Sequence, residues 1–269
     1  MMLRFLILAL AATAISCGGD STTTPTPTLP SSSNTPPQIA SLTSSSPRVE
    51  AEQEVTLTAT VTDAETNPSQ LAYAWSVSPA GGLFTGSGRE VRWRAPKPAP
   101  TPGLYTVTLT VTETYASGGA QRTNQVSGTV QVRYNDPIAE ITDISTTFFN
   151  DFMTDGVSAA QTVRNFSDSC PGKAQEQQDV QNVRNLFRAQ GAQFSFSSIV
   201  LDTPRTSAVV TAACTFRSIR RSDNQLEVSP GTCRLTAVYE PFRWWLCDSR
   251  FFPQGTAVPT SLGRLLSVN

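Results

Sequence analysis

Residues 104–112 read Leu-Tyr-Thr-Val-Thr-Leu-Thr-Val-Thr, and this stretch decides the fold of the first half of the chain. Its apolar side chains alternate with threonines at every second position. That is the period of an extended strand with one buried face and one face in water. Threonine suits the wet face because its β-branched side chain favours an extended backbone. The pattern predicts a half-buried β-strand.

The same alternation recurs at residues 54–62, where four apolar residues again alternate with four threonines. Four further strands are expected from composition, at Gln38–Thr43, Leu71–Val77, Arg89–Arg94 and Val126–Tyr134. Turn signals separate them, at Asn67-Pro68, Gly81-Gly82, Pro102-Gly103 and Gly118-Gly119. Short strands with turns at this spacing predict an all-β sandwich over residues 38–134.

Four segments of this region resemble the PKD/immunoglobulin-like repeats of bacterial envelope proteins: Asp63, Leu71–Trp75, Val91–Pro96 and Gly103–Val107. The resemblance covers nearly all of residues 38–134. It lacks the usual Gly-Asp-Gly after the tryptophan, where this chain reads Ser-Val-Ser-Pro. The resemblance implies that Trp75 is the core tryptophan, and that the module spaces, displays or binds other surfaces.

Three residues of this region have a functional alternative to a structural role. Asp63 and Glu65 lie in an expected loop and could touch Ca²⁺, although loop carboxylates more often hydrogen-bond their own backbone. Trp93 could be a platform for a sugar, although burial near the edge of the sandwich is the commoner role for such a residue. We therefore predict no metal site here.

Composition changes at Asn135-Asp136-Pro137, where Asp136 can cap a helix and Pro137 suits its first turn. Helical periodicity then predicts three helices, at 138–152, Ser158–Phe166 and Lys173–Ala189. Four strands follow, at Phe194–Leu201, Ser207–Ser218, Gly231–Tyr239 and Arg243–Phe252. Helices followed by an antiparallel meander predict a separate α+β domain over residues 135–253, with its helices packed on a curved antiparallel sheet.

The order of these elements resembles the NTF2-like, or cystatin-like, cone. The segment Leu235–Phe251 is similar to the last two strands of that fold. The resemblance spans residues 138–252 but lacks the early β-hairpin that often lies between the second and third helices. Some NTF2-like proteins are isomerases or dehydratases that use an Asp or a His inside the cone.

Candidate binding residues in this domain are few, because the chain contains no histidine. Asp168 and Asp248 are the carboxylates that the resemblance singles out, with a surface or turn role as the commoner account. Trp244 and Trp245 are adjacent, so in a strand they face opposite sides. One is expected in the core, and the other is packed under the C-terminal tail or exposed for a partner.

Four cysteines lie in the second region: Cys170, Cys214, Cys233 and Cys247. An even number in an exported domain predicts two disulfides, and the absence of a C-x₂-C pair argues against zinc. A turn near Asp223 would set Cys214 opposite Cys233 and leave Cys170 for Cys247. A bulge in that loop would allow Cys233–Cys247 instead.

The N-terminal residues 1–16 combine Arg4, an apolar run at 5–12 too short to span a bilayer, and Ala-Ile-Ser before Cys17. This resembles the lipobox of bacterial lipoproteins and implies a signal peptide with lipid on Cys17. Residues 17–37 follow as a Ser/Thr/Pro-rich linker, and residues 254–269 form a tail. Gly18, rather than Asp, favours the outer membrane or cell surface over the inner membrane.

Composition excludes several classes of function. The formal net charge of −1 leaves no basic footprint for nucleic acid. The absence of histidine excludes Ser-His-Asp triads and His-ligated metals, and no cofactor is expected. We expect a non-catalytic cell-envelope lipoprotein, not an enzyme, that is anchored to the membrane. Its Ig-like spacer would present an NTF2-like domain to an envelope protein or small molecule. The alternatives are a lipid-tethered enzyme or ligand carrier, and a glycan-binding protein.

Overall fold

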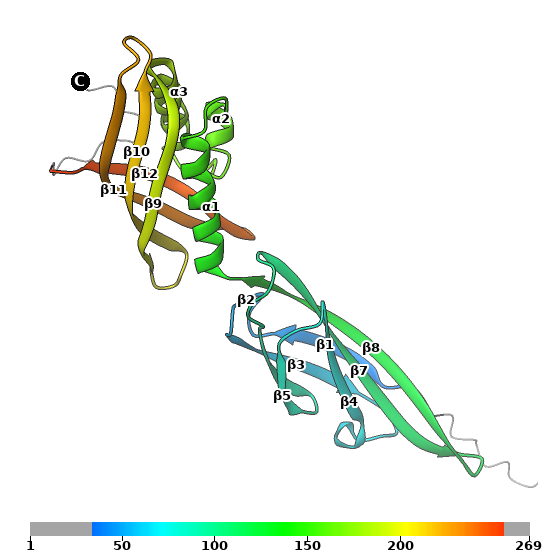
Figure 1. Ribbon diagram of the computed structural model, residues 1–269. Coiled ribbons are helices and arrows are strands. Elements are labelled where there is room, and N and C mark those ends of the chain that lie inside the picture. Colours follow the sequence, from blue (N-terminus) through cyan, green and yellow to red (C-terminus); the bar gives the residue numbers. More distant parts are fainter. Residues whose placement is uncertain (1–33, 256–269) are drawn as a thin grey trace, which may run out of the picture. The chain divides into compact units, whose positions relative to one another are not determined.

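The computed structural model of the chain describes residues 34–255 (Figure 1). The expected signal peptide 1–16, Cys17, most of the linker 17–37 and most of the tail 254–269 lie outside these residues. Within the described part, no helix combines the length and apolar character needed to cross a bilayer.

The first half of the described chain consists of two four-stranded sheets. One sheet has the strand order β1-β3-β6-β5, and the other has the order β2-β8-β7-β4. Adjacent strands are antiparallel except β2 and β8, which are parallel. The elements are β1 (Gln38–Ser44), β2 (Arg48–Glu50), β3 (Glu54–Thr62), the 3₁₀ helix η1 (Pro68–Gln70), β4 (Ala72–Ser78), β5 (Leu83–Ser87), β6 (Glu90–Arg94), β7 (Gly103–Ser117) and β8 (Ala120–Asn135).

The alternation read from residues 104–112 is present in β7, whose apolar residues in this stretch from Tyr105 to Val111 are buried at every second position. They meet the apolar residues of β3 and β6, so the two sheets share one interior. Strands β2 and β5 were not predicted from the sequence. The first has only three residues, and in the second Leu83 is 64% exposed, so neither carries a readable alternation.

Trp93, not Trp75, is the central tryptophan of this half. The Trp93 side chain is fully buried, and its ring centroid lies 5.0 Å from that of Tyr105. Trp75 is only partly buried, and its indole N–H donates to the carbonyl of Gly88. The expectation for Trp75 is therefore corrected. The reason is strand order, since β6 lies between two strands of its sheet whereas β4 is an edge strand.

Gly82 is required by this packing, because it has a φ of +74° and a Cβ there would overlap the Arg94 carbonyl oxygen and the Trp93 ring. We expect Gly82→Ala to lower the free energy of unfolding by roughly 2–4 kcal/mol. Gly88→Ala is the matched control, since Gly88 has a φ of +80° with no atom within 4 Å of the added methyl group. Urea unfolding of both variants measures the difference. Equal midpoints would show that the overlap is relieved without cost.

The second half combines three helices with a four-stranded antiparallel sheet of order β12-β11-β10-β9. Figure 1 shows the sheet curving around the helices, which lie on one of its faces. The predicted arrangement of helices packed on a curved antiparallel sheet is confirmed. The elements are α1 (Pro137–Phe152), α2 (Ala159–Thr162), α3 (Lys173–Leu186), β9 (Phe187–Leu201), β10 (Ser207–Arg220), β11 (Leu226–Glu240) and β12 (Arg243–Pro253).

Helix α1 begins as the sequence predicts. The carboxylate of Asp136 accepts a hydrogen bond from the backbone N–H of Ala139, and Pro137 occupies the first turn. Its buried stripe holds Ile141, Ile144 and three phenylalanines, whereas Ile138 is 45% exposed. The helix therefore presents one apolar face to the sheet.

Two helix boundaries differ from the prediction. Helix α2 is a single turn, although Ser158–Phe166 was expected to be helical. Helix α3 ends at Leu186 rather than Ala189, because Phe187 pairs with Arg220 and starts β9. Gly191, which lies two residues beyond the expected end of the helix, is inside that strand. Pairing with a distant strand outweighs local helix propensity here.

The two disulfides join Cys170 to Cys247 and Cys214 to Cys233, with Cα–Cα distances of 5.3 and 5.9 Å. The expected register of the second pair is wrong, since Cys214 lies opposite Gly231. The hairpin turns so that Ile219 pairs with Leu226, and the two cysteines become diagonal neighbours. A diagonal pair on one face of a sheet is still within reach of a disulfide.

Candidate ligand site

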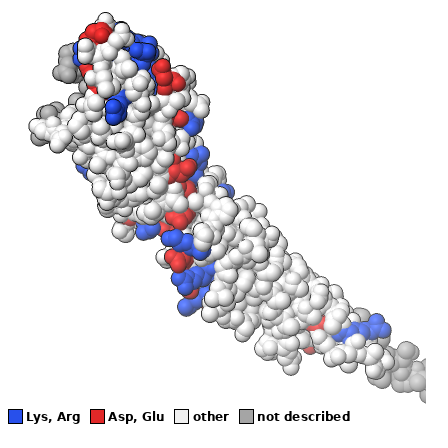
Figure 2. Space-filling model, in the orientation of Figure 1, with Lys and Arg blue, Asp and Glu red and all other residues white. Residues whose placement is uncertain are grey.

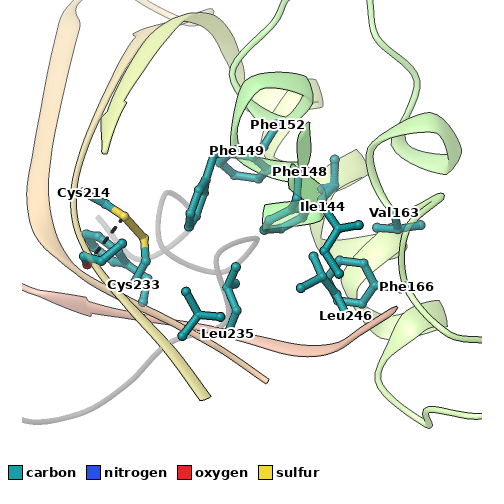
Figure 3. Close-up of a cluster of buried hydrophobic side chains, with 14 of the residues drawn as sticks. Ile144, Phe148, Phe149, Phe152, Val163, Phe166, Cys214, Cys233, Leu235 and Leu246 are labelled. Atoms are coloured by element: carbon teal, nitrogen blue, oxygen red, sulfur yellow. Dashed lines mark hydrogen bonds between the residues drawn. A yellow bond between two sulfur atoms is a disulfide. The ribbon is translucent and has the colours of Figure 1, made fainter. Parts of the chain in front are cut away.

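The concave face of the sheet is filled with aromatic rings. Five phenylalanines from the helices and the sheet have 1% exposure or less: Phe148, Phe149, Phe166, Phe216 and Phe251. Figure 3 shows Phe148, Phe149 and Phe152 projecting from α1 toward the sheet, above the Cys214–Cys233 disulfide and Leu235. The interior is therefore an apolar cluster in which ring meets ring.

This cluster reaches the surface along β9. The side chains of Phe194, Phe196, Ile199 and Leu201 pack against the core but are only partly buried. The ring centroid of Phe149 lies 5.0 Å from that of Phe194 and 6.3 Å from that of Phe196. We call Phe149, Phe194, Phe196, Ile199 and Leu201 together the aromatic mouth.

The position of β9 explains this exposure. β9 is the last strand of its sheet and, among the described strands, pairs only with β10. An edge strand has a neighbour on one side alone, so its inward side chains are covered less completely. The mouth offers apolar contact and ring stacking, and none of its five side chains titrates.

Glu176 on α3 is a buried carboxyl group that the sequence reading missed. The residue is 4% exposed, and its Oε1 has no hydrogen-bond partner among the described residues. The pKa of Glu176 is raised to about 7, mainly by burial and further by the charges of Asp179 and Asp248, while Ser249 and Arg250 act in the opposite direction. A signal existed, since Glu176 precedes the buried Val180 and Val183 at helical spacing.

Asp168 and Asp248 do not form a catalytic pair in the cone. The side chain of Asp168 is 94% exposed and bonds to Lys173 Nζ at 2.6 Å. The side chain of Asp248 is 39% exposed and accepts from Arg250 Nε at 2.8 Å. Both carboxylates therefore lie in partly exposed ion pairs with a nearby cation.

Trp244 and Trp245 face opposite sides of β12, as adjacent strand residues must. Trp244 is fully buried. Trp245 is half-buried, and the guanidinium of Arg243 lies 4.2 Å from its ring centroid. Arg243 therefore covers the ring that was expected to lie under the tail or meet a partner.

Glu140 is a second buried carboxylate that the sequence reading missed. It accepts hydrogen bonds from Thr101 Oγ1, from Asn135 Nδ2 at 2.8 Å and from the backbone N–H of Trp244 at 3.2 Å. A cavity of about 360 Å³ opens beside it, lined in part by Asp143 and Arg243. Because its oxygens are already occupied by donors, the carboxylate acts here as a structural acceptor.

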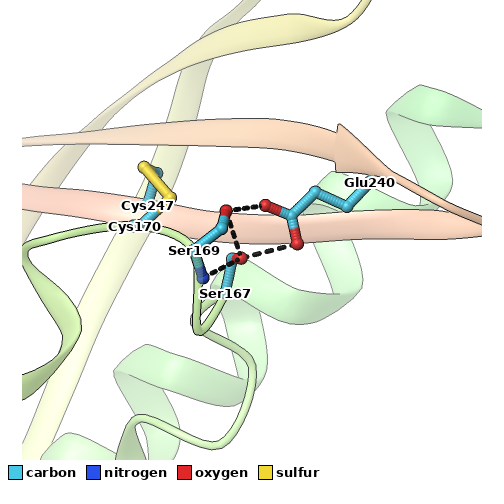
Figure 4. Close-up of a disulfide and its surroundings, with 5 residues drawn as sticks. All are labelled: Ser167, Ser169, Cys170, Glu240 and Cys247. Atoms are coloured by element: carbon cyan, nitrogen blue, oxygen red, sulfur yellow. Dashed lines mark hydrogen bonds between the residues drawn. A yellow bond between two sulfur atoms is a disulfide. The ribbon is translucent and has the colours of Figure 1, made fainter.

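The loop before α3 is fastened to the sheet at two places, as Figure 4 shows. One is the Cys170–Cys247 disulfide. The other is the carboxylate of Glu240, which accepts from Ser167 Oγ at 2.6 Å and from the hydroxyl of Ser169. These two hydrogen bonds, that of Ser167 first, lower the pKa of Glu240.

The loop carboxylates of the first half bond to their own surroundings. Asp63 Oδ1 accepts from the backbone N–H groups of Glu65 and Thr66, at 2.9 and 2.6 Å. Glu65 accepts from the backbone N–H and the hydroxyl of Thr35. Across residues 34–255, no three metal-binding side chains gather in one place.

The chain matches no family model and no curated protein. Solved structures similar to it include a ketosteroid isomerase-like protein from Erwinia carotovora, with 11% identity, a TM-score of 0.38, and coverage of 45% of this chain and 99% of that one. An NTF2-like superfamily protein from Salmonella enterica has 14% identity, a TM-score of 0.37, and coverage of 45% and 92%. A putative scytalone dehydratase from Novosphingobium aromaticivorans has 15% identity, a TM-score of 0.36, and coverage of 46% and 86%.

These structural neighbours are NTF2-like proteins. At such identities the likeness concerns the fold and decides no activity. The expectation that the chain is not an enzyme is nevertheless wrong as stated, because the neighbours include ketosteroid isomerase-like and dehydratase folds. None of these three neighbours is a PKD or immunoglobulin-like protein.

Proposed function

We propose that this chain is a lipid-anchored cell-envelope protein whose helix-and-sheet region binds an apolar ligand at the aromatic mouth. The observation that carries the proposal is the partial exposure of the phenylalanines of β9 in the mouth. Phe194 and Phe196 are held against the buried Phe149, yet both remain partly open to solvent. A ligand that covers these rings removes apolar surface from water, which favours binding.

The surroundings of the mouth support an uncharged ligand. Residues 189–201 of β9 contain no charged side chain. The face of the molecule drawn in Figure 2 is also largely uncharged over strands β9 to β11. A ligand with a formal charge would find no counter-ion among residues 189–201, so we infer a neutral aliphatic or aromatic molecule.

The membrane location rests on the sequence. The signal pattern that ends at Cys17 implies an acyl anchor, and residues 18–37 imply an extended spacer. An outer-membrane or cell-surface position follows from Gly18. The eight-strand region before α1, which resembles Ig-like modules, would then separate the ligand-binding region from the bilayer.

Replacing Phe196 by alanine should weaken ligand binding roughly tenfold, because about 1–2 kcal/mol of ring contact is lost. The assay titrates N-phenyl-1-naphthylamine, an uncharged fluorescent probe, into the full chain carrying Cys17→Ser, so that no acyl chain competes. Leu226→Ala is the control, since Leu226 is 52% exposed and lies outside the mouth. Absence of saturable binding, or an equal loss in both variants, would rule out the site.

A further inference from the structure

Helix α3 lies over the sheet with a carboxyl group in its buried face. Glu176 occupies that face one turn before Val180, which is fully buried in the aromatic core. An apolar residue would be expected at this position of the stripe. The carboxyl group instead faces β12, with one oxygen lacking any hydrogen-bond partner among the described residues.

The charges around Glu176 oppose its ionisation. Asp179 of the same helix and Asp248 of β12 both disfavour a negative charge there. Ser249 and Arg250 of β12 favour it, but together with these charges burial still leaves the pKa raised. Arg250 is itself paired with Asp248 at 2.8 Å. A neutral Glu176 is tolerated between α3 and β12, whereas an ionised one is a desolvated charge among like charges.

The ends of α3 are held independently of Glu176. The Cys170–Cys247 disulfide lies just before the helix, and β9 begins directly after it. Gly172 also packs closely on β12, since a Cβ there would lie 3.1 Å from the Cys247 carbonyl oxygen. Glu176 lies in the first turn of α3, so a change there acts on the helix just after the end that the disulfide attaches.

We propose that Glu176 is a proton-controlled latch that holds α3 against β12 and governs access to the core beneath the helix. When the carboxyl group is protonated, the latch is closed. When it ionises, α3 moves outward so that water reaches the carboxylate, and the side chains of Val180 and Val183 lose cover. The latch does not depend on ligand binding at the mouth.

The direction of the pH effect follows from the two protonation states. The pKa of Glu176 is about 7 in the folded protein, against an ordinary value of 4.5. The stabilising effect of the closed latch is thus fully present below about pH 4.5 and is lost as the pH rises through about 7. A periplasmic or surface protein would meet this range directly.

Hydrogen exchange tests the latch. Between pH 5.5 and 8.5, protection factors of α3 amides should fall roughly 10- to 100-fold relative to those of α1 in the wild-type chain. Glu176→Gln mimics the protonated form and should remove this fall. Asp143→Asn, which changes an exposed carboxylate on α1, should keep it.

Two results would overturn the latch. One is a fall in α3 protection that is the same in Glu176→Gln as in the wild type. The other comes from NMR titration of ¹³C-labelled glutamate carboxyl groups in the wild-type chain. A Glu176 signal that titrates near the ordinary pKa of a glutamate removes the proposal, whether or not the variant folds.

Discussion

Replacing Phe148 by alanine is expected to lower the free energy of unfolding by about 3–5 kcal/mol, the cost of a cavity in an aromatic core. Phe148 is fully buried. Its ring centroid lies 5.2 Å from that of Phe166, 5.7 Å from Phe149 and 6.2 Å from Phe152. Its removal takes one neighbour from each of three rings, and none of them can fill the space without leaving its own contacts.

Ile138→Ala is the control on the same helix. Ile138 is 45% exposed, so its truncation should change stability by no more than about 0.5 kcal/mol. Urea unfolding followed by tryptophan fluorescence compares the two variants. Similar midpoints would mean that the helix packs on the sheet less tightly than these ring distances indicate.

Glu140→Ala should be comparably severe, at about 3–5 kcal/mol, because it removes the acceptor of a buried hydrogen-bond group. The backbone N–H of Trp244 would lose its partner, and the side-chain amide of Asn135 would keep only its longer hydrogen bond, 3.4 Å to the Phe242 carbonyl oxygen. Tyr239 O–H donates to the Asn135 amide oxygen at 2.9 Å, so the loss extends to β11.

Two further variants separate charge from hydrogen bonding at this position. Glu140→Gln keeps one acceptor oxygen and should lie between the wild type and the alanine variant. Asp143→Asn, one turn closer to the C-terminus, changes an exposed carboxylate and should leave stability unchanged. Thermal unfolding and the near-UV circular dichroism of the buried Trp244 provide the readouts. A wild-type signal in Glu140→Ala would show that water replaces the carboxylate at no cost.

The local sequence pattern was sufficient to predict elements whose own residues show the alternation or the capping signal that forms them. Alternation with threonine located β3 and β7, and the Asp136-Pro137 start with its buried stripe located α1. The cysteine count and the order of the strands were enough to favour the two disulfides that the structure contains.

Features that depend on pairing between residues far apart in the sequence could not be predicted. Phe187 to Ala189 continue a helical pattern in the sequence, yet they pair with β10 and belong to β9. Trp93 exceeds Trp75 in burial because of strand order, which alternation does not encode. Glu140 stands in α1 as an ordinary first-turn acid, and its donors come from residues far away in the chain.

In the candidate site, too, local features could be predicted from the sequence and features that depend on distant pairing could not. The phenylalanines of β9 were expected in a strand, but their partial exposure depends on β9 being an edge strand. Asp168 and Asp248 were chosen because of the NTF2-like resemblance, and in the structure each pairs with a nearby cation. Glu176 could have been predicted, because it lies one turn before Val180 at the spacing of the buried face of α3.

The Cys170–Cys247 disulfide has a mechanical consequence for a chain that is pulled from its two ends. The two cysteines are 77 residues apart, and α3, β9, β10 and β11 lie between them. A pulling force passes through the sulfur–sulfur bond and bypasses this loop. Roughly 250 Å of contour therefore stays hidden while the bond is intact. The Cys214–Cys233 disulfide closes a smaller loop within this segment, so the full length becomes available to an unfolded chain only when both disulfides are reduced.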